Sequence, residues 1–396
     1  MTKCPFCFVE LPRSSGAFVC VGTCLEKPDP KASAARGTAV SNRTVFTWPH
    51  DPTQRRPRPQ SLYCSACGVA TSQAICPECH FLLPAGWHEL TTTCITLAGA
   101  RASGKSVYIA VLKRQAEMLA QRLGGSLGFF DQATANTFAL WYENPLWQAR
   151  KMLGPTARYT APDSTVRSPL MFTMPVRNSP GHVLVIRDVA GENLEDPNDL
   201  PPSAFAFFGH ADGLFFLVDP LRIDAIRNML TGVIPEPREP GGDPLLVFDN
   251  LVRVLRDRGN REKIDTPLAL VLSKFDALQA LAKVEDPEWG AFMRQPGAAY
   301  LRDPSLEQLA FDPDDADLLG AEVRSLLVRL QGTSLLNRTD VFRHMHLFAV
   351  SALGMPPVGE SLNPGGLAPF RCLDPLKWVL SQTGVIPVVT RSRVRA

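Results

Sequence analysis

The chain has 396 residues, of which 45% are hydrophobic and 20% charged, so it can build a sizeable core and is not a disordered polypeptide. Lysine and arginine number 41 against 39 acidic residues, and a net charge of +2 gives no general basic field for nucleic acid or membranes. At roughly 100–200 residues per domain, the length predicts two or three folding units. No apolar run reaches the ~20 residues of a membrane helix, and the first residues lack a signal-peptide core, so we expect a cytoplasmic protein.

Eight of the ten cysteines lie before residue 80, in four close pairs. Thiolates two or three residues apart can bind one metal ion from a tight turn, and two such pairs complete a tetrahedral zinc site. A disulfide framework is the alternative, and it fits poorly with a chain that shows no secretory signal. We predict two structural Zn²⁺ ions without an open coordination position, bound by Cys4, Cys7, Cys20, Cys24, Cys64, Cys67, Cys76 and Cys79.

The spacing leaves the pairing of these cysteines open. By default each site forms within its sequence neighbourhood, which joins the first four cysteines and the last four. A crossed arrangement, with Cys4 and Cys7 sharing an ion with Cys76 and Cys79, is the alternative. His80 is a further candidate ligand, although a solvated loop histidine is the simpler interpretation.

The sequence from about residue 25 to 62 is rich in Pro, Ala, Arg and Ser, a composition that predicts an extended linker. One strand is expected within it, over 44–48. We therefore predict a zinc-ribbon-like module over 1–88 that includes this linker, followed by a second domain over 89–390. Metal binding should supply the folding free energy of the module, because each zinc knuckle is too small to fold on apolar burial alone.

A phosphate-binding loop opens the second domain. A short β-like run, 94–98, leads into G-x4-G-K-S at 99–106, and a segment with helical periodicity follows. In this context backbone N–H groups surround a phosphate, Lys105 reaches the β and γ oxygens, and Ser106 binds Mg²⁺. The predicted phosphate site consists of Gly99, Ala100, Arg101, Ala102, Ser103, Gly104, Lys105, Ser106 and Val107.

Three later strands end in residues with the chemistry of a nucleotide site. The first ends in Asp188 and continues as D-x-x-G to Gly191; in a doubly wound sheet this Asp lies beside the phosphate loop and holds Mg²⁺ through water. The second runs into Ser273-Lys274-Phe275-Asp276, where a carboxylate accepts the N1–H and 2-amino protons of guanine, which adenine does not offer. The third leads to Ser351 and Ala352, whose backbone would contact the guanine carbonyl.

Residues from about 92 to 385 resemble the TRAFAC-class GTPase domains of bacteria, and most closely the double-GTPase type of predicted bacterial conflict systems, often preceded by a cysteine-rich zinc module. The resemblance implies an α/β fold with a mostly parallel, doubly wound sheet, and Mg²⁺-dependent hydrolysis of GTP to GDP in a nucleotide-dependent switch. It rests on 76–80 with Leu83 and Pro84, 99–106, 188–192, 213–220, 374–380 and 384–387.

Two positions depart from the pattern of that class. Its first switch supplies a threonine to Mg²⁺, and three threonines precede the strand at 170–176: we favour Thr165, then Thr160, with Thr156 also available. Glu192 follows D-x-x-G where many GTPases place a water-orienting glutamine. We expect Lys105 and Glu192 to act in catalysis. Arg101 is a candidate arginine finger in cis, although a solvated loop residue is the simpler interpretation.

Two other classes of protein remain as alternatives. A pseudo-GTPase scaffold would bind nucleotide without turnover and dock a protein partner on its zinc module or switch loops. A zinc-dependent nucleic-acid-binding protein regulated by nucleotide is motivated by basic runs at 55–58 and 391–395 and opposed by the near-neutral charge. Cys94 and Cys372 are expected to be free and buried. Because no zinc ligand belongs to the nucleotide site, we expect chelation to unfold residues before about 85 with little effect on nucleotide affinity.

Overall fold

The computed structural model describes residues 1–12, 14–48, 59–154, 168–174, 181–196, 202–234, 241–256 and 262–389. Within these ranges the second part of the chain forms a seven-stranded sheet in the order β14-β13-β12-β8-β11-β10-β9. Its strands are β8 (Thr91–Ala98), β9 (Gly128–Phe129), β10 (Leu170–Met174), β11 (His182–Asp188), β12 (Gly213–Val218), β13 (Leu268–Leu272) and β14 (Met345–Ala349). β11, β8, β12, β13 and β14 run parallel, and β10 and β9 add an antiparallel edge. The prediction of a mostly parallel sheet is confirmed.

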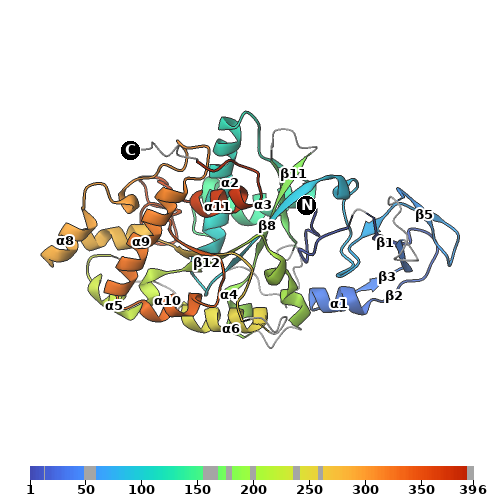
Figure 1. The fold of residues 1–396 in the computed structure, drawn as a ribbon, viewed down its shortest axis with the longest axis horizontal. Coiled ribbons are helices and arrows are strands. Elements are labelled where there is room, and N and C mark those ends of the chain that lie inside the picture. The colour runs from blue at the N-terminus through green and yellow to red at the C-terminus, as the bar shows by residue number, and fades with distance from the viewer. Residues whose placement is uncertain are drawn as a thin grey trace, which may run out of the picture.

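Helices cover both faces of the sheet, which is why its central strands are almost uninterrupted apolar runs: every residue of β12 and β13 is buried. In Figure 1, α2, α3 and α11 lie on one side of the strands and α4, α6 and α10 on the other, while α9 packs on the edge strand β14. The α-helices are α2 (Lys105–Arg122), α3 (Gln132–Phe138), α4 (Gly191–Glu195), α5 (Asp224–Met229), α6 (Pro244–Arg256), α7 (Phe275–Gln279), α8 (Pro287–Met293), α9 (Pro313–Arg329), α10 (Thr333–Thr339) and α11 (Asp374–Gln382).

Shorter helical turns connect these elements. The 3-10 turns are η1 (Trp87–Glu89), η5 (Pro202–His210), η6 (Pro220–Arg222), η7 (Ala280–Lys283) and η8 (Ala299–Leu301), and η2 (Ala139–Gln148) is a π-helix that contains Pro145. Across the described ranges, no helix combines the length and the apolar character needed to cross a membrane.

The order of the strands fixes where a ligand can bind. β8 lies between β11 and β12, so the chain leaves it toward one side of the sheet and later returns on the other. The carboxyl ends of these three strands meet, with Asp188 paired to Leu97 and Phe216 to Ala98. Open α/β sheets bind ligands in the crevice at such a reversal. The loop at 99–104 therefore emerges at the expected ligand-binding edge.

The N-terminal part is a small β-rich layer, at one end of the molecule in Figure 1. β1 (Gly16–Val19), β4 (Val45–Trp48) and β7 (Ala74–Ile75) form one antiparallel sheet, and β2 (Lys27–Pro28) pairs with β3 (Ser41–Asn42) and β5 (Leu62–Tyr63) with β6 (Ala70–Thr71). The strand expected over 44–48 is present as β4. Residues 49–58, with the whole basic run at 55–58, lie outside the described residues, and so does the second basic run at 391–395.

The prediction of an extended linker over 25–62 is wrong for its first half, which contains the helix α1 (Pro30–Arg36) between β2 and β3. Asp29 caps this helix by accepting a hydrogen bond from the backbone N–H of Ala32, and Pro30 occupies its first turn. Buried Ala32 and Ala35 give it an apolar face, which packs against η5.

Packing is continuous across the predicted domain boundary at 88/89. Phe6, Phe8 and Trp87 belong to the same buried apolar cluster as the strands of the large sheet. Trp87 Nε1 donates to the carbonyl of Lys3 (2.8 Å), and the backbone N–H of Thr92 donates to the carbonyl of Met1 (3.1 Å). A separate, smaller cluster formed by Ala17, Val19 and Ile75 lies farther out. The division into 1–88 and 89–390 stays a prediction.

Candidate functional site

The phosphate loop is shaped by a glycine that no other residue can replace without a clash. Gly99 has a φ of 142°, and a Cβ there would lie 2.4 Å from the carbonyl oxygen of Leu217. α2 begins at Lys105, whose Nζ donates to the carbonyls of Gly99 (2.8 Å) and Ala100 (3.0 Å). Burial lowers the pKa of Lys105, and the carboxylates of Asp188, Glu192 and Glu195 oppose that shift. A buried cation thus stands inside a loop at a helix N-terminus, a suitable receptor for an anion.

The predicted magnesium ligands Ser106 and Asp188 are in contact. Ser106 Oγ donates to Asp188 Oδ2 at 3.2 Å, although these side chains come from different elements, α2 and β11. Tyr142 of η2 donates to the same carboxylate oxygen at 3.4 Å, and burial, followed by the Asp188 charge, raises the pKa of Tyr142. A hydroxyl and a carboxylate are the hard oxygen donors that Mg²⁺ prefers, so the donor set fits the ion. No motif marks Tyr142, and the sequence analysis missed it.

Gly191 lies directly against the phosphate loop, since a Cβ there would lie 2.5 Å from the backbone nitrogen of Arg101. Glu192, the predicted water-positioning residue, follows in α4. Its Oε1 is 3.8 Å from Nε of Arg101, which also lies 3.8 Å from Oε2 of Glu195. Arg101 therefore faces two carboxylates rather than standing alone in solvent, although its side chain remains 42% exposed. No sequence motif marks Glu195.

The S-K-x-D segment is bound to the phosphate loop by its own side chains. Lys274 has a left-handed backbone (φ 51°), and its Nζ donates to the carbonyl of Ala102 (2.9 Å) and to Asp219 Oδ2 (2.7 Å). Ser273 Oγ donates to the carbonyl of Ser103 at 2.8 Å. The first two residues of the segment thus fix its distance from the phosphate loop. Asp219, directly after β12, holds Lys274 in place, a role that the sequence did not indicate.

Asp276 stands at the other end of the site and accepts a hydrogen bond from Ser351 Oγ at 2.5 Å. Burial raises the pKa of Asp276, and the hydrogen bond from Ser351 opposes the shift. Ser351 is itself 2% exposed, so it contributes to the site by orienting the Asp276 carboxylate. Ala352 follows it and lines the site.

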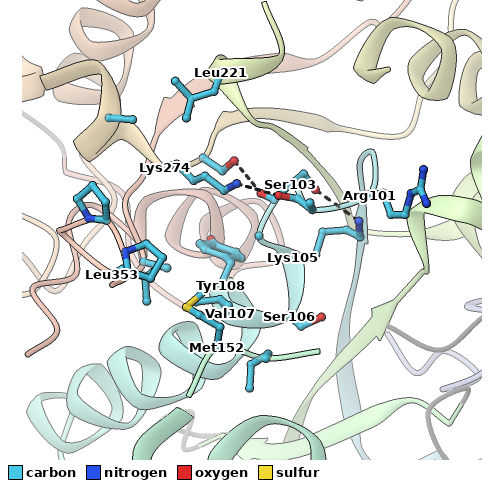
Figure 2. Close-up of a pocket in the computed structure, with 18 of the residues that line it drawn as sticks. Arg101, Ser103, Lys105, Ser106, Val107, Tyr108, Met152, Leu221, Lys274 and Leu353 are labelled. Atoms are coloured by element: carbon cyan, nitrogen blue, oxygen red, sulfur yellow. Dashed lines mark hydrogen bonds between the residues drawn. The ribbon is translucent and has the colours of Figure 1, made fainter. Parts of the chain in front are cut away.

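A cavity of about 380 Å³ joins these groups, within the range of small-molecule sites. Figure 2 shows Arg101 and Lys105 toward one end of it and Leu353 toward the other, with Lys274 between them along one wall. Among the predicted residues it is lined by Arg101, Ala102, Ser103, Gly104, Lys105, Ser106, Val107, Gly191, Glu192, Ser273, Lys274, Asp276 and Ala352. Gly99, Ala100, Asp188 and Ser351 lie behind this lining and bond to it. Thr156, Thr160 and Thr165 lie outside the described residues.

Two segments far apart in sequence meet at the wall of the cavity. The backbone N–H of Met152 donates to the carbonyl of Glu360, and that of Leu362 donates to the carbonyl of Arg150, both at 2.8 Å. Lys151 and Ser361 face each other between these bonds in an antiparallel bridge. Met152 and Glu360 also line the cavity. We call this pair of segments, 150–153 and 358–362, the clamp; it was not foreseen from sequence.

The eight paired cysteines form two groups, and the default pairing of sequence neighbours is wrong. Cys4, Cys7, Cys76 and Cys79 form one group, the proximal tetrad, and Cys20, Cys24, Cys64 and Cys67 form the other, the distal tetrad. The crossed alternative is the arrangement found. Pairing of β1 with β7 places Ile75, next to Cys76, opposite Ala17 in the N-terminal part of the chain.

Both tetrads fit a tetrahedral metal. Sulfur–sulfur distances are 3.6 Å for Cys4–Cys79 and for Cys7–Cys76, 3.4 Å for Cys20–Cys67 and 3.7 Å for Cys24–Cys64. Four thiolates around Zn²⁺ at ~2.3 Å would be about 3.8 Å apart, close to these values. All sulfurs of each group lie within 4.8 Å of one another.

The remaining cysteine and histidine predictions are settled by contacts. His80 Nδ1 lies 2.7 Å from Asp29 Oδ2, so His80 pairs with the residue that caps α1. Burial would raise the pKa of Asp29, but hydrogen bonds from Ala32, Asn42 and His80 hold it at about 2. Cys94 and Cys372 are free and buried, as expected.

Comparison with known proteins identifies a matching family model and a curated relative. The family model Double-GTPase 2 matches residues 93–329. A protein of Mycolicibacterium smegmatis described as a putative ESX-1 scaffolding and assembly protein, SaeC, is 42% identical over 98% of this chain and 100% of its own length.

Solved GTPase structures resemble the chain only distantly. A bacterial selenocysteine-specific elongation factor, EF-Sec, aligns with 65% of this chain and 26% of its own, at 14% identity and a TM-score of 0.24. The GTPase-like domain of S. cerevisiae Ski7, bound to GDP and inorganic phosphate, aligns with 74% of this chain and 50% of its own, at 10% identity and a TM-score of 0.30. The chain thus spans about a quarter and a half of these two, and TM-scores of this size carry no argument about its function.

Proposed function

Because the chain belongs to the Double-GTPase 2 family, we propose that it is a Mg²⁺-dependent, TRAFAC-class protein that binds GTP, hydrolyses it to GDP and acts as a nucleotide-dependent switch. The observation that supports this most is the direct hydrogen bonding between the phosphate loop and the S-K-x-D segment. Lys274 and Ser273 bond to the phosphate loop at Ala102 and Ser103. A base-reading carboxylate, Asp276, and a phosphate receptor are thereby held across one cavity.

At the phosphate end, the proposed roles follow from charge. Lys105 and the loop amides of 99–106 would bind the β and γ oxygens, and Ser106 and Asp188 would hold Mg²⁺ together with a threonine of 156–165. When bound, the ion would neutralise negative charge on the nucleotide. Tyr142 would fix the orientation of Asp188 through its hydroxyl. Phosphoryl transfer in such sites depends on positioning and electrostatics, so these contacts carry most of the chemistry.

At the base end, we propose that Asp276 selects guanine. Its carboxylate can accept both the N1–H and the 2-amino group of the base, provided that it is ionised and correctly turned. The hydrogen bond from Ser351 does both, because it favours the charged form and fixes the rotation of the carboxylate.

Glu192 is the proposed residue that orients the attacking water, with Arg101 as the cation that holds it. Their atoms lie 3.8 Å apart, close enough for an electrostatic attraction but too far for a hydrogen bond. A carboxylate held by a loop arginine can polarise water from a fixed position. Isolated domains of this kind are often slow until a partner completes the site.

A scaffold that binds GTP without turnover is the second candidate, favoured by the 42% identical relative described as a putative scaffolding and assembly protein. In either case we propose two structural Zn²⁺ ions in a zinc-ribbon-like module, and a protein partner that docks on that module or on the switch loops. The comparisons give no support to a role in a conflict system, and we do not propose one.

Calorimetric titration with GTP, GDP and ATP, with and without Mg²⁺, tests the binding proposal. GTP and GDP should bind in the presence of Mg²⁺ and ATP should not; equal binding of ATP contradicts it. Single-turnover phosphate release then separates the candidates, because a scaffold would retain intact GTP indefinitely while a GTPase releases phosphate in the same complex.

A further inference from the structure

Arg187 is a buried cation in a position that the proposed reaction does not use. It is 3% exposed and lies on β11 immediately before Asp188. Its Nη1 donates to the backbone carbonyl of Phe6 at 2.6 Å. The guanidinium carbon is 4.3 Å from the centre of the Phe6 ring and 3.7 Å from that of Phe207. A cation so far from solvent depends on these partners, because removing any of them leaves its charge poorly solvated.

Phe6 lies in the turn between Cys4 and Cys7, two residues of the proximal tetrad. Its backbone N–H points to the sulfur of Cys4 at 3.4 Å, as expected for a metal-binding turn. Its ring stacks on Phe81 at 5.3 Å, two residues after Cys79. The Cys4–Cys7 turn and the segment after Cys79 therefore contact each other through Phe6, the residue whose ring and carbonyl also contact Arg187. A metal ion that fixes the turn also fixes the direction of the Phe6 carbonyl.

On its other side Arg187 contacts the segment that follows the D-x-x-G motif. Phe207 belongs to η5, and its ring also meets the edge of Phe8 at 5.9 Å. Ser203 of the same turn donates to the carbonyl of Ala34 in α1 at 2.9 Å. Figure 1 shows α1 beside this part of the large domain. The N-terminal module thus contacts both the strand that ends in Asp188 and the turn that follows Gly191.

We propose that Arg187 is a positioning residue that couples the proximal metal site to the nucleotide site, by setting the end of β11 and hence the position of Asp188. The inference rests on the proposed function. Coupling of this kind is reciprocal: if metal at the proximal tetrad favours Mg²⁺–nucleotide binding, then Mg²⁺–nucleotide raises the affinity of the tetrad for its metal by the same factor. We expect this gain in affinity to act on the dissociation step, as a slower loss of that metal. This replaces the sequence-based expectation that chelation leaves nucleotide affinity nearly unchanged.

The distal tetrad provides an internal control. Its cysteines belong to the outer part of the module, next to the small cluster of Ala17, Val19 and Ile75, whereas the proximal cysteines belong to the main core. Two of its members, Cys24 and Cys67, are partly exposed, and all four proximal cysteines are buried. The two ions should leave at different rates, and only the slower loss should respond to nucleotide.

The test is chelator-driven release of Zn²⁺ from the full chain, followed with a zinc-sensitive dye. Release is compared without nucleotide, with Mg²⁺–GDP and with Mg²⁺ and a non-hydrolysable GTP analogue; binding of each nucleotide is measured first in the same preparation. We expect a fast phase unaffected by nucleotide and a slow phase retarded about fivefold or more, within the usual range of allosteric coupling. A Cys20→Ser variant assigns the phases, because it should lose only the fast one.

Arg187→Met should abolish the response of the slow phase and raise the Mg²⁺ concentration needed for half-maximal nucleotide binding. Arg187→Lys, which keeps the charge, should retain part of both effects. Arg114→Met is the matched control: it also removes an arginine from an aromatic ring, that of Trp147 at 4.4 Å, but neither residue lines the cavity or belongs to a tetrad, and it should change neither.

Two nucleotide-independent phases in a wild-type chain that binds Mg²⁺–nucleotide would overturn the coupling, whether or not the variants fold. Absence of Mg²⁺–nucleotide binding in the preliminary titration would instead contradict the proposed function, and the coupling with it.

Discussion

Ser351 donates a hydrogen bond to Asp276 at 2.5 Å, so a residue two positions after β14 orients the carboxylate that would read the base. Replacing Asp276 by Asn should cost ~2–3 kcal/mol or more of GTP binding free energy, because a charge-assisted acceptor is lost. The variant should also shift preference toward xanthine nucleotides, whose 2-oxo group needs a donor. Titration with GTP and XTP measures both effects, and unchanged GTP affinity would contradict the role of Asp276.

Ser351→Ala should keep base preference but weaken GTP binding by about 0.5–1.5 kcal/mol, the net value of one hydrogen bond. Its effect should be absent in the Asp276→Asn background if the hydroxyl acts only through that carboxylate. A double-mutant cycle by calorimetry measures this coupling, and additive losses would show that Ser351 acts by another route.

The pH dependence of GTP binding follows from the buried Asp276. Its pKa lies above the ordinary value of 3.8, and only the ionised form can accept both guanine protons. GTP affinity should therefore decline as the pH falls through this raised pKa, earlier than a solvent-exposed Asp would allow. The free energy of unfolding should depend on pH in the opposite direction, because protonation of Asp276 favours the folded state. The stabilisation from Asp276 is present at low pH and is lost as the pH rises through its folded-state pKa. Asp276→Asn should remove both dependences.

Binding and turnover should separate at the phosphate end. Lys105→Ala should lose most nucleotide binding, since the side chain is the buried cation of the loop. Glu192→Ala should retain binding and change the rate of single-turnover phosphate release. Glu195→Ala is the matched control, because it faces the same arginine atom at 3.8 Å but follows one helical turn later. Equal turnover in the Glu192 and wild-type chains would remove that residue from the mechanism.

The clamp should limit nucleotide release. Lys151 and Ser361 form an antiparallel bridge, so cysteines at both positions are close enough for a disulfide. In a Lys151→Cys/Ser361→Cys chain, oxidation should slow dissociation of a fluorescent GDP about tenfold or more, and reduction should restore it. The single-cysteine chains are controls for oxidation elsewhere. Equal rates in a cross-linked and a reduced chain would show that release does not pass the clamp.

Zinc content tests the crossed pairing of cysteines. The wild-type chain should contain close to two zinc ions by elemental analysis, and four disulfides in their place would contradict the zinc proposal. Cys4→Ser/Cys79→Ser should lose one ion, because both belong to the proximal tetrad, whereas Cys4→Ser/Cys20→Ser should lose both. Pairing of sequence neighbours would reverse these two results.

The parts of the site that sequence predicts best are contiguous. Residues 99–106, 188–191 and 273–276 each combine a strand end with a short motif, and parallel pairing of β8 with β11 and β12 then brings the strand ends together. Local chemistry and a general rule of α/β sheets were sufficient here.

What the sequence left open, as for the proximal tetrad, or did not predict depends on contacts between distant segments. The proximal tetrad, the pair Tyr142–Asp188 and the clamp each join residues that no local pattern relates. α1 is a different case, because Asp29 and Pro30 are a recognisable helix start. There the average composition of the segment concealed a local signal.

The crossed cysteines are also nested, and this sets an order of assembly. Cys24 and Cys64 are 40 positions apart and lie wholly within the 69 positions between Cys7 and Cys76. The distal ligands are complete once Cys67 has been synthesised, before either of the last two proximal cysteines exists. If the inner loop closes first, the outer closure joins a much shorter effective chain, which lowers its entropic cost by roughly 0.8 kcal/mol. Closure of the distal tetrad would then favour closure of the proximal tetrad, which packs against the large sheet. Zinc supply during synthesis would therefore affect whether the N-terminal part is folded when the sheet packs against it.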